Sequence, residues 1–167
     1  AKKDLDKYKY QFYKEYAYFL KEGICQDHEF QEPLSKLLYF ETSKGKKNQT
    51  VSFDEYISRC APEQKEIYYL HVPSREMAIE SPYLEAFTKV GREVIFVYTP
   101  IDDFVMANLK SFQGRNIVTI EKSGIDLGND MKKENEDSNS HPEKLSTSEA
   151  DEFCAWFKMT LGNDKVS

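Results

Sequence analysis

Three short apolar runs in the middle of the chain constrain its fold more than any other feature. They are EIYYLHV (66–72), EVIFVY (93–98) and NIVTI (116–120). Each is nearly continuous in aliphatic, β-branched and aromatic residues, which is typical of strands buried on both faces of a parallel sheet. The stretches between them have the length of the helical crossovers that parallel strands need. The sequence therefore predicts an α/β fold, with a short, mainly parallel sheet inside a small three-layer αβα unit.

Capping residues predict where the helices of this unit begin and end. Ser81-Pro82 combines an N-cap with a proline at the first helical position, where the missing N–H costs nothing. Gly91 follows at a position that suits the left-handed conformation of a helix end. Thr99-Pro100 repeats the start signal, and Asp102 is placed to complete a capping box with Thr99. We expect this second helix to run to Gln113-Gly114.

Length, charge and cysteine content narrow the class of protein. The chain has 167 residues, enough for one domain with a core and some appendages. Its formal net charge of −6 argues against nucleic acid as the main partner. No apolar run reaches the roughly 18 residues of a membrane span, and no secretory signal is visible. Because the chain starts at Ala1 without an initiator Met, we expect a segment of a larger protein. Three widely spaced cysteines, Cys25, Cys60 and Cys154, indicate a reducing compartment.

Residues 1–43 are predicted to form a helical arm. Its first helix spans 4–22, with Asp4 as the cap and Gly23 as the stop. The apolar residues expected near one face are Leu5, Tyr8, Phe12, Tyr16, Phe19 and Leu20. Lysines interleave these rings, which leaves two interpretations open. One is a helix packed on its neighbours with the lysines in water, and the other is a stacking platform for single-stranded nucleic acid. The periodicity favours packing.

Composition divides the rest of the chain. Residues 44–122 hold the small α/β unit, which begins with a polar loop and a capping box from Ser52 to Glu55. Residues 123–147 are polar, charged and poor in apolar groups, so we interpret them as a flexible linker. Residues 148–167 contain a last helix over 149–161. Its expected apolar face is Ala150, Phe153, Phe157 and Leu161, with Trp156 and Met159 off that stripe.

Asp102 and Asp103 are candidates for chemistry. They follow the second predicted strand, at the edge of the sheet where open α/β folds bind ligands. Paired carboxylates suit Mg²⁺, and a Mg²⁺-dependent phosphoacceptor-like domain is the alternative function. Helix capping explains the same pair and is favoured, because no acid follows the first strand. The chain has no glycine-rich phosphate loop, no HExxH motif and no nucleophile elbow, and its histidines and cysteines lack the spacing of metal ligands. We therefore assign no catalytic, cofactor-binding or metal-ligating residue.

Longer segments resemble one known family. Those that resemble the second half of the middle domain of heat-shock protein 90 chaperones are SFDEYISRCAPEQKEIYYL (52–70), SREMAIESPYLEAF (74–87), EVIFVYTPIDDF (93–104) and LKSFQGRNIVTIEK (109–122). Residues 19–43 resemble the helical arm before that region. SEADEFCAWFKMTLG (148–162) resembles the start of the family's C-terminal dimerisation domain. The segment SPYLEAF and the helix with Ala155-Trp156 are most similar to the mitochondrial paralogue.

This resemblance implies a fragment of an ATP-driven, homodimeric chaperone that binds and remodels non-native client proteins. It implies a mitochondrial location, with the cytoplasm as the alternative. The fragment itself is expected to be a lever and a client or interdomain contact surface without its own ATPase site, while ATP and Mg are bound elsewhere in the parent. The expected partners are clients, other domains and a second copy, and neither nucleic acid nor membrane. Tyr39 and Cys60 depart from the family, which usually has Arg and Met at these positions.

Surplus apolar side chains are the candidates for that contact surface. The helices carry more large apolar groups than one buried stripe uses, and adaptable binding faces are rich in aromatic residues and Met. The candidates for contact with clients or neighbouring domains are Tyr98, Phe104, Met106, Phe112, Trp156 and Met159. For Phe104 and Phe112, an internal position in the core is the favoured alternative.

Overall fold

The computed structural model describes residues 4–122, Ile125 and part of the segment 149–160. In that segment the described residues, all helical, are Glu149, Glu152, Phe153, Ala155, Trp156, Met159 and Thr160. The chain forms two compact units, residues 1–127 and 128–167. Apart from Ile125, the predicted linker lies outside the described residues, and the predicted domain boundaries remain predictions. Within the described part of the chain, no helix has the length and apolar character needed to cross a membrane.

The N-terminal part of the arm, residues 5–26, is one continuous helical segment. α1 (Leu5–Lys7) passes into the π-helical η1 (Tyr8–Tyr13) and then into α2 (Lys14–Gln26). The helix continues past Gly23, the predicted stop. A Cβ at Gly23 would lie 3.2 Å from Cδ1 of Leu34, a residue of α3 (Gln31–Ser35). Gly23 therefore lets α2 and α3 approach closely instead of ending the helix.

The α/β class is confirmed by a sheet of six strands in the order β2-β1-β4-β3-β6-β5. The three predicted strands form its parallel centre as β3 (Glu66–His71), β4 (Val94–Val97) and β6 (Arg115–Thr119). Antiparallel pairings are added by β1 (Phe40–Thr42), β2 (Thr50–Val51) and β5 (Ser111–Phe112). The sheet is therefore mixed, with fewer parallel pairings than the sequence predicts.

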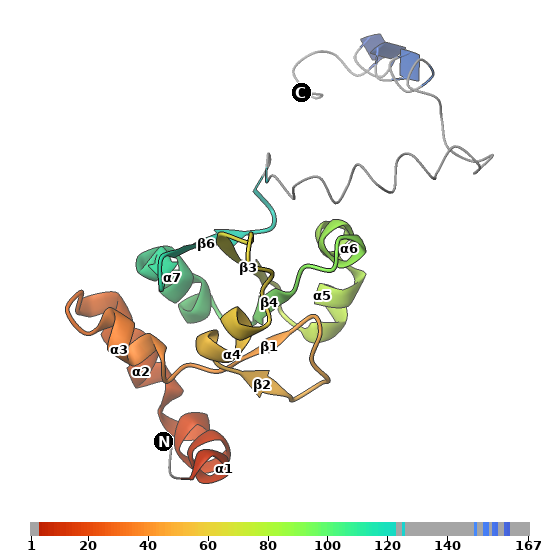
Figure 1. Cartoon of the computed structure of the whole chain (residues 1–167). Coiled ribbons are helices and arrows are strands. Elements are labelled where there is room, and N and C mark those ends of the chain that lie inside the picture. Colours follow the sequence, from red (N-terminus) through yellow and green to blue (C-terminus); the bar gives the residue numbers. More distant parts are fainter. Residues whose placement is uncertain are drawn as a thin grey trace. The chain divides into compact units, whose positions relative to one another are not determined.

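Helices cover both faces of the sheet in the three layers expected (Figure 1). Ile67 and Tyr69 of β3 face a core that also contains residues of α2, α4 (Phe53–Ser58) and α7 (Pro100–Leu109). Tyr68 and Leu70, their neighbours in the same strand, face a second core beneath α5 (Arg75–Glu80) and α6 (Pro82–Lys89). Because successive side chains of a strand point to opposite faces, a nearly continuous apolar run is needed to fill both cores.

The predicted helix starts are present. Ser52 Oγ accepts a hydrogen bond from the Glu55 N–H (3.2 Å), and Glu55 Oε2 accepts one from the Ser52 N–H (2.9 Å). Pro82 opens α6, and Gly91 after that helix has a φ of +67°. These local signals act within a few residues, which is why the sequence alone locates them.

The end of α7 differs from the prediction. Lys110 has a φ of +56° and ends the helix, so Phe112 lies in a strand and not on the helix. Gln113 (φ +48°) and Gly114 (φ +75°) then form the two-residue turn of the β5–β6 hairpin. Two consecutive positive φ values are what a type I′ hairpin turn requires.

The two outer strands, β2 and β5, have only two residues each. At β2 the arm adds a covering side chain. Lys9 Nζ donates to the Thr50 carbonyl at 3.0 Å and lies 4.3 Å from the ring centroid of Tyr39. The ammonium group thus occupies a backbone acceptor of this outer strand.

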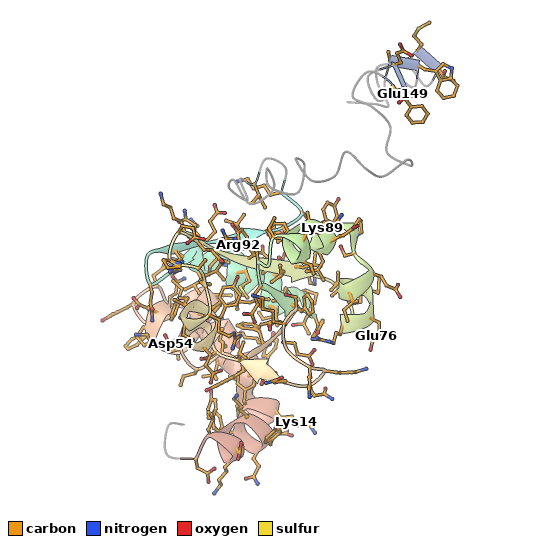
Figure 2. The ribbon with its side chains drawn as sticks, turned by 45° about the vertical axis from the view of Figure 1, so that its right-hand side comes forward. Lys14, Asp54, Glu76, Lys89, Arg92 and Glu149 are labelled. Carbon is orange, nitrogen blue, oxygen red and sulfur yellow. The ribbon has the colours of Figure 1, made fainter. Side chains whose placement is uncertain are left out.

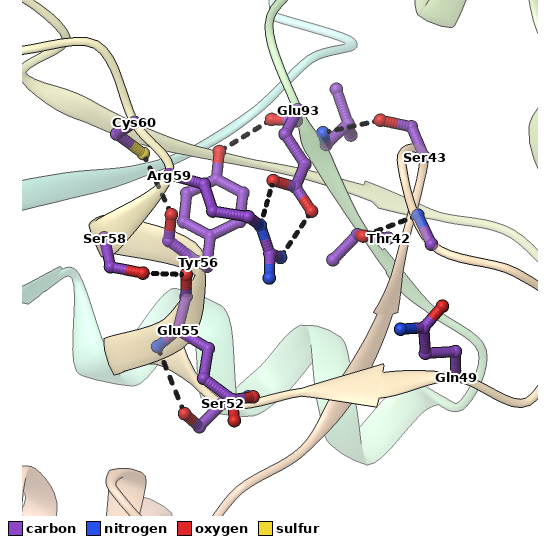
Figure 3. Close-up of polar contacts among 12 residues, drawn as sticks. Thr42, Ser43, Gln49, Ser52, Glu55, Tyr56, Ser58, Arg59, Cys60 and Glu93 are labelled. Carbon is purple, nitrogen blue, oxygen red and sulfur yellow. Dashed lines mark hydrogen bonds and ion pairs between the residues drawn. The ribbon is translucent and has the colours of Figure 1, made fainter.

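Tyr56 joins α4 to the two central strands. Its hydroxyl donates to the Glu93 carbonyl at 2.7 Å and accepts from the Tyr68 N–H at 3.2 Å. Arg59 donates two hydrogen bonds to the Glu93 carboxylate, from Nε (3.0 Å) and Nη2 (2.6 Å), as Figure 3 shows. Tyr56 is fully buried, so these backbone groups have no access to water and depend on its hydroxyl.

Candidate protein-binding surface

Most large apolar side chains exposed in the described part of the first unit lie on the arm. They include Tyr10, Phe12, Tyr16, Tyr18 and Phe19. Four of these rings form a series of contacts, with centroid distances of 4.9 Å for Phe12–Tyr16, 6.4 Å for Tyr16–Phe19 and 6.1 Å for Tyr18–Phe19. The arm therefore presents a connected group of aromatic rings to solvent.

The predicted buried face of the arm is wrong in part. Phe12, Tyr16 and Phe19 are exposed, whereas Tyr8 and Ile24 are buried. The cause is η1. A π-helical turn bonds residue i to i+5 and so turns the chain less per residue than an α-helix does. A stripe counted at 3.6 residues per turn across η1 therefore assigns residues on its two sides to the wrong faces.

An apolar hollow of about 540 Å³ lies between the arm and α7. It is lined by Tyr18, Lys21, Thr99, Pro100, Ile101 and Phe104. Phe104 is 62 % exposed, so the favoured core position for this residue is wrong. The hollow combines aromatic walls with few polar groups, which is the usual composition of a site for an apolar side chain.

One ion pair joins the two elements that form the hollow. Lys21 Nζ of α2 lies 2.6 Å from Oδ1 of Asp102 in α7. The other carboxylate oxygen of Asp102 accepts hydrogen bonds from the Thr99 hydroxyl (2.6 Å) and the Thr99 N–H (3.3 Å). Asp102 therefore completes the capping box with Thr99, as predicted. Both charged side chains are nearly buried.

The carboxylates of Asp102 and Asp103 have separate structural partners. Asp102 is held by Lys21 and Thr99, and Asp103 Oδ1 accepts from the Tyr69 hydroxyl at 3.2 Å. Among the described residues, no group of three or more His, Cys, Asp or Glu side chains is arranged to hold a metal ion. The geometry therefore gives no support to the Mg²⁺-dependent alternative.

The remaining candidate residues divide into buried and exposed groups. Met106 and Phe112 are each only 1 % exposed and belong to the core beneath α7, so as contact residues they are corrected to core positions. Trp156 and Met159 are exposed in the second unit, where the Trp156 ring stacks on Phe153 at 6.2 Å. Trp156 and Met159 belong to the second unit, and Phe104 belongs to the first.

Tyr98 lies in a polar network at the end of β4. Its hydroxyl donates to Glu41 Oε2 at 2.9 Å, and Arg75 Nη1 donates to the same oxygen at 3.0 Å. Burial, together with the hydrogen bond to Glu41, raises the pKa of the Tyr98 phenol. Because its polar end is already engaged within the fold, Tyr98 is a weaker candidate for contact with a partner than Phe104.

Two lysines of the arm are engaged in contacts within the protein. Lys9 is directed to the Thr50 carbonyl and Lys21 to Asp102, while Lys14 is exposed on the arm (Figure 2). A platform for single-stranded nucleic acid combines stacking rings with cations that follow the phosphates. With two of the lysines engaged in protein contacts, the geometry favours a protein-binding surface.

Tyr69 gives a prediction about high pH. Burial, followed by the neighbouring charge of Asp103, raises the pKa of Tyr69 from 10.0 to about 12. Between these values the folded chain holds a proton that the unfolded chain has lost, so the free energy of unfolding falls as pH rises through this window. We expect Tyr69→Phe to reduce that fall, measured by urea unfolding at about pH 9 and about pH 11. Tyr10→Phe, at an exposed position, serves as the control, and an equally steep fall in Tyr69→Phe would contradict the prediction.

The hollow was not predicted, although one sequence signal was present. Tyr18 lies off the stripe that the arm would use for packing, and such surplus rings mark candidates for contact. Lys21 carried no such signal, because a lysine on a helix is usually solvated. Its pairing with Asp102 depends on the packing of α2 against α7, which no local pattern encodes.

Comparison with known proteins gives consistent matches along the whole chain. The profile of the family described as "Hsp90 protein" matches residues 1–167. The mitochondrial TNF receptor-associated protein 1 homolog of Dictyostelium discoideum is 39 % identical over 170 residues, which cover 100 % of this chain and 23 % of the relative. Chaperone protein HtpG of Desulfotalea psychrophila is 37 % identical over 154 residues, covering 92 % and 24 %. The mitochondrial heat shock protein 75 kDa of Rattus norvegicus is 34 % identical over 167 residues, covering 98 % and 23 %. The chain thus spans about a quarter of the length of these curated relatives.

Proposed function

Because this chain belongs to the Hsp90 family, we propose that it is part of an ATP-driven chaperone and carries contacts with client proteins and neighbouring domains. The match over its whole length supports this, and so does the similarity to chaperone protein HtpG. In this proposal the ATP and Mg site lies outside residues 1–167, and the parent is a homodimer. The lack of a glycine-rich phosphate loop in the sequence supports the first point.

We place the parent protein in mitochondria. Two of the relatives named above are mitochondrial proteins, which supports this location. The bacterial HtpG relatives are of comparable identity, so the cytoplasm is the alternative location. Imaging of the full-length protein with an epitope tag, alongside a mitochondrial marker, distinguishes the two locations.

The hollow between the arm and α7 carries the proposal of client contact. Non-native proteins expose apolar side chains that folded proteins bury, and an open apolar hollow with an aromatic rim can receive them. Phe104 forms part of this rim and Tyr18 faces the same space. Trp156 and Met159 of the second unit are kept as a further contact region, since both are exposed.

Binding of a permanently unfolded polypeptide tests this role. We expect Phe104→Ser to weaken binding by about tenfold, because central aromatic residues of protein contacts typically contribute at least about 1.4 kcal/mol. The measurement is fluorescence anisotropy of a labelled polypeptide that cannot fold. Phe30→Ser is the matched control, since Phe30 is similarly exposed but does not line the hollow. Equal affinity of the Phe104→Ser variant and the unsubstituted chain would remove the hollow from the client surface.

A further inference from the structure

We propose that Lys21 and Asp102 act as a clasp that sets the separation of the two walls of the hollow. They are positioning residues that act through Tyr18 and Phe104. This inference rests on the proposed client role for its consequence, but its structural part is independent of that role.

The two walls come from elements that are far apart in the sequence. Tyr18 and Lys21 lie three residues apart on α2, so they point in similar directions from that helix. Ile101 and Phe104 lie three residues apart on α7 and form the opposite wall. The shape of the hollow therefore depends on how α2 is held relative to α7.

The carboxylate of Asp102 is fixed from its own side. Oδ2 is engaged by both the hydroxyl and the N–H of Thr99, which tie it to the start of α7. Within the described residues, Oδ1 is buried and has no partner apart from Lys21. The capping box thus sets the orientation of the carboxylate, and the remaining oxygen, Oδ1, is directed to Lys21 of the arm.

The ion pair makes the packing of α2 against α7 sensitive to the relative position of the two helices. Apolar contact between α2 and α7 favours burial but does not depend strongly on a shift of one helix along the other. A pair at 2.6 Å, with side chains only 14 % and 8 % exposed, is sensitive to such a shift. Loss of one partner leaves an uncompensated buried charge, which favours arrangements in which α2 and α7 move apart and admit water.

Four variants separate positioning from general stability. Lys21→Met removes the ammonium and keeps an apolar stem of similar length, and Asp102→Asn keeps an acceptor for the Thr99 cap. Each alone should lower the urea midpoint of unfolding. The double variant Lys21→Met/Asp102→Asn leaves no unpaired charge, so its midpoint should return to that of the unsubstituted chain. Lys21→Arg keeps the charge and should preserve both stability and hollow geometry.

The decisive readout is the NMR shift of the Ile101 δ1 methyl group, which senses the aromatic rings that line the hollow. We expect this signal to stay displaced in the double variant even though stability recovers, and to stay in place in Lys21→Arg. Lys36→Met removes an exposed ion pair with Glu32 and should leave the signal unchanged. A double variant in which both the midpoint and the methyl signal match the unsubstituted chain would overturn the clasp.

Binding of the unfolded polypeptide gives the functional consequence. In the double variant we expect affinity to fall about tenfold despite normal stability. If the unsubstituted chain itself does not bind, or Phe104→Ser has no effect, the proposed client role fails. The methyl signal then still decides whether the clasp sets the geometry of the hollow.

Discussion

Replacing Phe112 by Ala is expected to lower the free energy of unfolding by about 3–5 kcal/mol. Phe112 is 1 % exposed, and its ring stacks on Phe53 of α4 at a centroid distance of 5.1 Å. The substitution removes these contacts and leaves a cavity, because the surrounding core of strands and helices cannot collapse to fill it. Urea unfolding followed by circular dichroism measures the change.

The matched control is Phe104→Ala. Phe104 is exposed, so its loss should change stability by no more than about 0.5 kcal/mol. The two phenylalanines thus separate a core role from a contact role with the same chemical change. If Phe112→Ala kept normal stability but lost binding of the unfolded polypeptide, Phe112 would return to the contact surface.

Replacing Tyr56 by Phe is expected to cost about 2–4 kcal/mol, although it removes a single oxygen. The hydroxyl satisfies two buried backbone groups, the Tyr68 N–H within β3 and the Glu93 carbonyl just before β4. Without it both groups remain buried and unpaired, and each such group costs about 1–3 kcal/mol. The same urea titration measures the effect.

Tyr10→Phe provides the comparison for this loss. Tyr10 is 69 % exposed, so water replaces any contact of its hydroxyl and stability should change by less than about 0.5 kcal/mol. A Tyr56→Phe variant as stable as Tyr10→Phe would mean that water enters the site and pairs with the two backbone groups.

The parts of the fold that were predictable are those encoded within a few residues. The central strands are nearly continuous apolar runs, since both faces of β3 and β4 are buried. The cap at Ser52 and the turn at Gly91 follow from the chemistry of one or two side chains. β1, β2 and β5 were missed because strands of two or three residues form only through pairing with a neighbour.

The candidate site was predictable only in part, and Asp102 explains much of the error. The residues of α7 buried against the core are Asp102, Val105, Met106 and Leu109, a regular helical stripe. The first residue of this buried stripe is Asp102, a carboxylate. A count of apolar residues alone therefore assigns Ile101 and Phe104 to the buried face instead. Asp102 is tolerated there because Lys21, which lies 81 positions earlier in the chain, neutralises it.

The short outer strands have a consequence for the proposed function. An open sheet edge is a template on which an extended polypeptide can add a strand, and unfolded clients supply such polypeptide. β2 and β5 offer two residues each, and Lys9 occupies the Thr50 carbonyl on β2. These short edges therefore disfavour strand addition by the unfolded chains that the proposed function involves. Contact with such chains is expected through side chains and not through the backbone of the sheet.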